Sequence, residues 1–174
     1  MKVRAPRPTD AAGIARVHVR AWQEGYKNGL MPDDFLARLS IGERTEMWEG
    51  ILAREAGPRS GRFVSVDESD SVTGHIMVGP AEGDPDASTG EVYSLNVDPD
   101  HWGRGHGSML LTAGAQALGK AGFTEAVLWV HTGSHRSRRF YEHNGWQADG
   151  TERTVEVLGA AAPESRYHLD LSDV

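Results

Sequence analysis

The sequence lacks cysteine, long hydrophobic runs and an excess of basic residues, and each absence excludes a class of protein. Without cysteine, the chain forms no disulfide, no thiolate metal site and no thiol nucleophile. No apolar stretch approaches the roughly 18 residues that a membrane-spanning helix needs. The basic residues near the N-terminus are not followed by the apolar region of a signal peptide. We therefore expect a cytoplasmic protein that does not bind membranes.

The charge balance is acidic. The 174 residues include 18 Lys and Arg against 25 Asp and Glu, which gives a formal net charge of −7. Non-specific nucleic-acid binding draws most of its energy from basic residues, so we expect no nucleic-acid partner. An acidic protein suits a small cationic partner such as an amine better than a polyanion. The length fits a single domain, residues 1–174, that can bury its own core.

The hydrophobic pattern predicts helices in the N-terminal third and a mixture of strands and helices after it. Ile14, Val17 and Ala21 are spaced as one face of a helix, and Ser40 with Glu43 forms a capping box. The elements predicted are a strand around Val3, helices starting near Thr9, after Pro32 and at Ser40, strands 62–66, 72–78 and 91–97, helix 105–121, strand 126–130, helix 134–143, and strands 152–158 and 166–171, with a polar loop at 79–90. The order β-α-α-α-β-β-β-α-β-α-β-β predicts an α/β fold with a mixed, mostly antiparallel sheet flanked by helices.

The most informative stretch is VYSLNVDPDHWGRGHGSMLL, residues 92–111, in which a strand leads through a glycine-rich loop into a helix. Gly103, Gly105 and Gly107 let backbone N–H groups turn toward one point and let a ligand approach closely. That point lies at a helix N-terminus, which favours an anion. Arg104 adds a positive charge. The pattern therefore predicts a phosphate or pyrophosphate cradle.

Two common phosphate-binding motifs do not match this loop. A Walker A loop requires Lys-Ser/Thr after its last glycine, where this chain has Ser108-Met109. A Rossmann fingerprint requires a third glycine at position 108 and a first βα unit. A nucleotide-binding phosphoryl-transfer protein stays an alternative, for which Asp98 and Asp100 are the candidate Mg²⁺ ligands.

A second stretch, residues 128–146 (LWVHTGSHRSRRFYEHNGW), reads as a buried strand, a polar turn and a helix carrying Phe140 and Tyr141. Together the two stretches resemble the GNAT superfamily, the acyl-CoA-dependent N-acyltransferases. The glycine loop is similar to the family's Q/R-x-x-G-x-G/A motif, and RRFYEHNGW is similar to its A-x-x-F-Y-x-x-x-G-F segment. AWQEGYKNGLMP also resembles a stretch that walls the acceptor site in one subgroup. The predicted order of elements fits the family, so the resemblance covers nearly the whole chain.

The resemblance implies a GNAT-like fold and transfer of an acetyl group from acetyl-CoA, without a metal, to a small-molecule or peptide amine. It implies a set of cofactor-binding residues on the strand, the glycine loop and the second helix: Leu95, Asn96, Val97, Trp102, Gly103, Arg104, Gly105, His106, Gly107, Ser108 and Ser134. In the family the strand bulges, and one N–H, from Leu95 or Asn96, polarises the thioester carbonyl. Three positions depart from the family: Trp102 replaces Gln or Arg, Ser134 replaces Asn, and Asn96 replaces an aromatic residue.

Two residues are the candidates for proton transfer. An alkylamine has a pKa near 10.4 and is almost wholly protonated at pH 7, so a general base or a water relay assists its attack. The resemblance places a carboxylate near the acceptor nitrogen, which favours Glu91, with His75 as a rival. A phenol with a pKa of about 10 can protonate the departing thiolate at neutral pH, and we assign this role to Tyr141.

Several aromatic and arginine side chains have both a structural and a functional interpretation. Trp22 and Tyr26 share one face of the first helix and either pack in the core or wall the acceptor pocket. Three arginines, at 136, 138 and 139, either meet the cofactor's 3′-phosphate or, as we favour, form a solvated helix face. His131 and His135 lack an acidic third ligand, so we expect no metal site there. A non-catalytic acyl-CoA-binding module of the same fold is the alternative to an enzyme, and the resemblance leaves a homodimer open.

Overall fold

The computed structural model describes residues 1–82 and 88–172, and its elements follow the predicted order. The helices are α1 (Ala11–Gly25), α2 (Asp33–Ala37), α3 (Ile41–Leu52), α4 (His106–Lys120) and α5 (His135–His143), with short 3-10 turns at Pro8–Asp10 and Pro99–His101. The strands are β1 (Lys2–Arg4), β2 (Gly61–Val66), β3 (Val72–Pro80), β4 (Thr89–Val97), β5 (Glu125–His131), β6 (Gln147–Val157) and β7 (Ala160–Asp170). The predicted fold class is confirmed. None of the described helices is long and apolar enough to cross a membrane.

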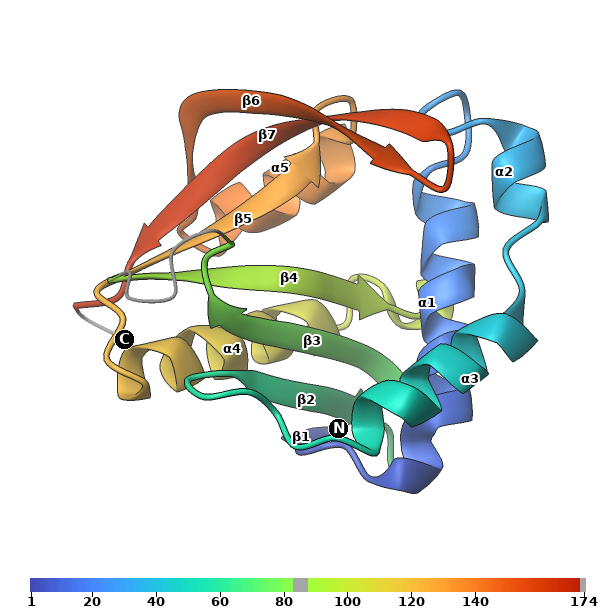
Figure 1. Ribbon diagram of the computed structural model, residues 1–174, viewed down its shortest axis with the longest axis horizontal. Coiled ribbons are helices and arrows are strands. Elements are labelled where there is room, and N and C mark those ends of the chain that lie inside the picture. Colours follow the sequence, from blue (N-terminus) through green and yellow to red (C-terminus); the bar gives the residue numbers. More distant parts are fainter. Residues whose placement is uncertain (83–87, 173–174) are drawn as a thin grey trace.

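The strands form one seven-stranded sheet in the order β1-β2-β3-β4-β5-β7-β6. Its pairs are antiparallel except β4–β5, which is parallel and joins only Thr89–Val92 to Glu125–Leu128. Beyond Val92 the two strands separate, and Figure 1 shows β4 and β5 diverging toward α1. Among the described residues, no strand therefore pairs with the β5-facing edge of β4 after Val92.

A β-bulge lies where this separation begins. The β3–β4 register pairs Val78 with Val92 but Met77 with Ser94, so Tyr93 is the extra residue. A bulge leaves one residue unpaired and bends its strand. The predicted bulge is thus present, and it lies at the point where β4 leaves β5.

Hydrophobic residues bury both faces of the sheet. On one face α4 packs through Leu110 and Leu118 against Ile76 and Leu128. On the other face α1 and α3 pack through Ile14 and Trp48. A third cluster joins α2 to the β6–β7 hairpin, where Phe35 and Leu36 pack with Ala160 and Ala162. The helices therefore pack on the sheet on both sides of the point where β4 and β5 diverge.

Several predicted boundaries were wrong by a few residues. The predicted loop at 79–90 is shorter, because β3 continues to Pro80 and β4 begins at Thr89. Gly90 belongs to β4, where it pairs with Pro80 and Ala126. A Cβ there would lie 2.7 Å from the Leu118 side chain, so the packing of α4 favours glycine at this position. Residues 83–87 of this loop lie outside the described residues.

The last two strands begin earlier than predicted, at Gln147 and Ala160. The first half of β6 is an exposed edge and has none of the apolar alternation that marks a strand. The sequence pattern therefore predicted only the second half of β6.

Candidate functional site

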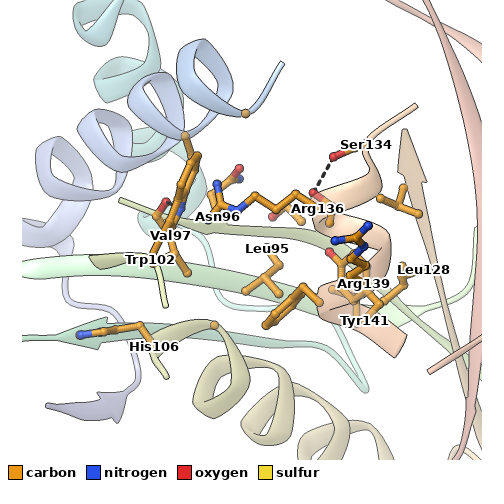
Figure 2. A pocket seen from close by; sticks show the side chains of 18 of the residues that line it. Leu95, Asn96, Val97, Trp102, His106, Leu128, Ser134, Arg136, Arg139 and Tyr141 are labelled. Atoms are coloured by element: carbon orange, nitrogen blue, oxygen red, sulfur yellow. Dashed lines mark hydrogen bonds between the residues drawn. The ribbon is translucent and has the colours of Figure 1, made fainter. Parts of the chain in front are cut away.

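A cleft of about 780 Å³ lies where β4 and β5 diverge. Residues of α1, β4, the glycine loop, β5, α5 and β7 line it, and Figure 2 shows their side chains converging on one space. It collects most of the predicted site residues: Trp22, Tyr26, Leu95, Asn96, Val97, Trp102, Gly103, Gly105, His106, Gly107, Ser108, Ser134 and Tyr141. Two predicted residues, Arg104 and Glu91, do not line it.

The glycine loop begins α4 at one wall of the cleft. Gly103 and Gly105 have φ angles of +72° and +86°, which L side chains rarely adopt, and Gly105 is the N-cap of the helix. A Cβ on Gly107 would lie 3.0 Å from the ring of Phe140 on α5, so this glycine lets the two helices approach. The first N–H groups of a helix lack intrahelical partners and carry positive potential. The loop therefore has the backbone geometry of an anion cradle.

An arginine and a tryptophan meet across the cleft. The Trp102 indole Nε1 donates to the Val97 carbonyl oxygen at 2.7 Å, which fixes the ring against β4. The guanidinium carbon of Arg136, on α5, lies 3.2 Å from the centre of that ring, and Figure 2 shows its side chain reaching over to Trp102. Partial burial lowers the pKa of Arg136, but a guanidinium stays charged. A cation thus stands beside the cradle although the loop itself carries Trp102.

The three arginines of α5 do not act as one solvated face. Arg136 and Arg139 line the cleft. Arg138 instead donates from Nε to the Tyr167 hydroxyl at 3.0 Å and from a terminal nitrogen to the Thr132 carbonyl at 3.3 Å. Arg136 and Arg139 are exposed, as predicted for a solvated face, but they also line the cleft. The prediction is wrong for Arg138, which is half-buried and bonded to Tyr167.

Two predicted cofactor residues have side chains that are already bonded. The Nδ1 atom of His106 lies 2.7 Å from the Thr73 hydroxyl, and Figure 2 shows the ring pointing away from the cleft. Burial also lowers the pKa of His106. The Ser134 hydroxyl donates to the Ser137 hydroxyl at 2.9 Å. His106 therefore offers its backbone rather than its ring to the cleft.

Aromatic residues of α1 and α5 wall the other end. Trp22 and Tyr26 have ring centres 4.9 Å apart, and both also pack against the cluster beneath the β6–β7 hairpin. Trp22 and Tyr26 thus both pack against the core and line the cleft, so the two interpretations are compatible. Burial raises the pKa of Tyr26 to about 12 and raises the pKa of Tyr141 further above its ordinary value. A phenol in this environment keeps its proton at neutral pH.

The Glu91 carboxylate lies outside the cleft. It lines a second cavity of about 310 Å³ with Trp129 and Arg153, and it accepts a hydrogen bond from the Glu82 N–H at 3.0 Å. Trp129 lines both cavities. Burial raises the pKa of Glu91, which makes it a stronger base than an exposed glutamate.

His75 is also outside the cleft. It is fully buried, and burial lowers its pKa to about 3. Its Nε2 atom lies 3.2 Å from Nδ2 of Asn96, which does line the cleft. His75 therefore contacts the site through Asn96.

Ser94 and Glu164 are among the cleft-lining residues that the sequence reasoning did not identify. The hydroxyl of Ser94, at the bulge, is buried without a hydrogen-bond partner among the described residues. Glu164 reaches the cleft from β7. No local motif marks either residue, because the bulge and the pairing of β7 with β5 bring them there. Within residues 1–82 and 88–172, no three His, Cys, Asp or Glu side chains are grouped to hold a metal.

Comparison with known proteins identifies relatives. A family model described as the acetyltransferase (GNAT) family matches residues 19–146. The chain is 31% identical over 128 residues to the uncharacterized N-acetyltransferase YuaI of Bacillus subtilis. The alignment covers 74% of this chain and 70% of YuaI. It is also 42% identical over 62 residues to the mycothiol acetyltransferase of Beutenbergia cavernae. This shorter alignment covers 36% of this chain and 21% of that protein.

Solved structures share the fold at low sequence identity. The structure of yncA from Salmonella typhimurium with its cofactor acetyl-CoA has a TM-score of 0.72 and 21% identity, and covers 100% of this chain and 95% of that one. The PaiA N-acetyltransferase of Thermoplasma acidophilum in complex with coenzyme A has a TM-score of 0.69 and 18% identity, over 95% and 98% of the chains. From its sequence relatives and its fold, the chain belongs to the GNAT family and is an acyltransferase.

Proposed function

We propose that the protein transfers an acetyl group from acetyl-CoA to a primary amine by direct attack. The observation that carries the proposal is the cleft between β4 and β5, with the glycine cradle at one wall and the Tyr141 phenol at another. The acceptor reaches the thioester from the end walled by Trp22 and Tyr26.

The residues that line the cleft fit the chemical parts of acetyl-CoA. The backbone N–H groups at residues 105–108 meet the pyrophosphate, and Arg136 and Arg139 supply positive charge beside it. Within the described part of the chain, no strand pairs with the β5-facing edge of β4 at residues 94–97, and this edge pairs with the amides of the pantetheine arm. A backbone N–H of Leu95 or Asn96 polarises the thioester carbonyl.

The transfer forms a C–N bond and breaks a C–S bond. The ammonium first loses a proton, and the neutral nitrogen attacks the thioester carbonyl carbon. The electron pair of the C–S bond leaves on sulfur, the nitrogen loses a second proton, and the thiolate gains one. An ammonium and acetyl-CoA thus become an amide, CoA and one released proton.

The protein's own groups handle these protons. Tyr141 donates its phenolic proton to the departing sulfur, because its raised pKa keeps it protonated before the transfer. The resulting tyrosinate takes up the second proton that the nitrogen loses, so the phenol is restored. Glu91 accepts the first proton of the amine through a bridging water, since its carboxylate lies in the adjoining cavity rather than in the cleft. Its raised pKa supports this role.

The phosphoryl-transfer alternative loses its metal ligands. Both carboxylate oxygens of Asp98 accept hydrogen bonds from Arg20, at 2.7 and 2.8 Å, and Asp100 pairs with the same arginine at 3.0 Å. A Mg²⁺ ion would have to displace this guanidinium. The acyltransferase proposal therefore fits the site better.

Calorimetric titration with acetyl-CoA, with ATP and NAD as controls, tests the first half of the proposal. We expect micromolar binding of acetyl-CoA alone. Release of the CoA thiol in the presence of a primary amine then tests turnover. Binding without thiol release for any amine would support the non-catalytic module instead, and the absence of acetyl-CoA binding by the folded protein would overturn the proposal.

A further inference from the structure

Glu164 is a carboxylate at the aromatic end of the cleft. Among the described residues that line the cleft, the carboxylates are Glu24 and Glu164. Glu24 is exposed and ion-paired with Lys27. The Glu164 side chain is only 20% exposed, and it lines the cleft together with Trp22, Tyr26 and Tyr141. A partly desolvated carboxylate attracts a cation more strongly than an exposed one.

The strand register and one arginine hold this carboxylate in place. Glu164 pairs across the sheet with Arg153 of β6, and the Arg153 Nε donates to its Oε2 at 2.7 Å. The Arg153 guanidinium in turn lies 4.0 Å above the ring of Trp129, which fixes the arginine as well. Within the described residues, no hydrogen bond reaches the second oxygen, Oε1. One carboxylate oxygen is thus held while the other is available to a ligand.

The field of Glu164 extends over the acceptor end. Its negative charge adds to burial in raising the pKa of Tyr26, and it also raises the pKa of Glu91. The nearby rings of Trp22 and Tyr26 have faces that attract cations. A carboxylate among aromatic rings is the chemistry that recognises an alkylammonium group.

We propose that Glu164 binds the ammonium group of the acceptor, so that the site selects primary amines that are cationic at neutral pH over neutral molecules of the same shape. The inference rests on the proposed function for the identity of the acceptor end. Binding at Glu164 positions the nitrogen, and loss of its proton follows as described above.

A pair of probes that differ only in charge tests the proposal. The protein is saturated with CoA, which cannot transfer an acetyl group, and titrated at pH 7 with 2-phenylethylamine or with 2-phenylethanol while amide NMR shifts are followed. We expect the amine to bind at least about tenfold more tightly than the alcohol, because a hydrogen bond to a charged group is involved. We expect Glu164→Gln to abolish this preference and Glu164→Asp to restore part of it.

Two further variants exclude trivial outcomes. Glu156→Gln, on the exposed side of β6, removes the same charge away from the cleft and should keep the preference for the amine. The double variant Arg153→Gln/Glu164→Gln removes both partners of the ion pair and leaves neither unpaired. We expect it to lose the preference for the amine as well. A folding defect caused by an unpaired Arg153 cannot then explain the loss in the single variant. Equal binding of amine and alcohol by the unaltered protein, or no binding of either, would overturn the inference, as would an unchanged preference in folded Glu164→Gln. Failure of CoA itself to bind would instead refute the proposed function, and the amine–alcohol comparison on the free protein would still decide the role of Glu164.

Discussion

At the scale of single residues, the cleft combines a protonated phenol with backbone groups that glycine makes accessible. Tyr141 packs at 5.2 Å from the ring of Phe140, which itself contacts the cradle at Gly107. One dipeptide on α5 thus places both the phenol and the support of the glycine loop. The adjacent positions on the helix point about 100° apart, which allows the two rings these different neighbours.

Tyr141→Phe should lower kcat by about 10²- to 10⁴-fold, because it removes the proton donor for the leaving sulfur. Affinity for acetyl-CoA should change little, since the ring and its packing remain. Steady-state kinetics with calorimetry of acetyl-CoA binding checks both expectations. If Tyr141→Phe keeps full turnover, another group must donate the proton to the leaving sulfur.

Gly105→Ala should weaken acetyl-CoA binding and destabilise the protein. Its φ of +86° costs an L residue about 1–2 kcal/mol, and relaxation of this strain moves the N–H groups of the cradle. Gly122→Ala is the matched control, because Gly122 has a φ of +88° but lies after the far end of α4 with open space around it. We expect both variants to lose similar unfolding free energy in denaturant titrations. Equal acetyl-CoA affinity in the two variants would contradict a role for the cradle.

At the scale of elements, the cleft exists because β4 leaves β5 at the Tyr93 bulge, while α5 follows β5 and returns along the opening. Arg136 on α5 and Trp102 on the glycine loop therefore face each other across the gap. Trp102, which replaces the family's usual Gln or Arg, acts as a platform that holds a cation from the other wall. The positive charge of this site is thus supplied from a different element.

Arg136→Gln should reduce acetyl-CoA affinity by about tenfold at low salt, because it removes a charged partner of the phosphates. The difference from the unaltered protein should shrink as ionic strength rises. Arg138→Gln removes the same charge from the same helix, but its side chain is bound to Tyr167 and it should leave the affinity unchanged. Calorimetry at two salt concentrations measures both variants. Similar losses in both would indicate a general effect of net charge rather than a contact.

At the scale of the whole molecule, α1 and α3 enclose a pair of histidines behind the site. His18 and His75 have ring centres 5.9 Å apart, and the Trp48 ring packs against both. Burial lowers the pKa of His18 to about 4 and that of His75 to about 3. Both rings are therefore neutral in the folded protein at neutral pH, and they support β3 beneath the cleft.

Acidification should destabilise the fold between pH 6.5 and 4.5. In this range the unfolded chain protonates both histidines, with ordinary pKa values near 6.5, while the folded protein keeps them neutral. Each such proton lowers the unfolding free energy by about 1.4 kcal/mol per pH unit. The raised carboxyl pKa of Glu91 acts in the opposite direction and reduces the slope.

Denaturant unfolding at several pH values measures this slope, and His75→Gln should reduce it by about one proton. A free energy of unfolding that stays constant from pH 6.5 to 4.5 would contradict the prediction. It would mean that the two rings are solvated or already charged. A loss that begins only below pH 4 would belong to the carboxylates with lowered pKa, such as Asp10 and Asp149.

Local sequence patterns predicted most of the fold and most of the residues that we propose to contact the cofactor. The order of elements and the positions of the glycine loop and Tyr141 were predicted, because helix periodicity, capping and left-handed glycines depend on neighbours in the chain. Their roles in binding and proton transfer stay predictions. The exact extents of β4 and β6 were not predicted. Gly90 joins β4 through pairing with Pro80 and Ala126, which are distant in the chain, and the first half of β6 has no apolar alternation.

The sequence by itself determined the fold class and the glycine loop at the start of α4, whereas the tertiary structure decided which charged side chains face the cleft. Glu91 and Glu164 are both glutamates on strands, yet only Glu164 lines the cleft, and the register of β7 with β5 and β6 places it there. Arg136 and Arg138 are two residues apart, yet one reaches Trp102 and the other Tyr167. Such choices depend on distant elements meeting in space, and no short stretch of sequence contains that information.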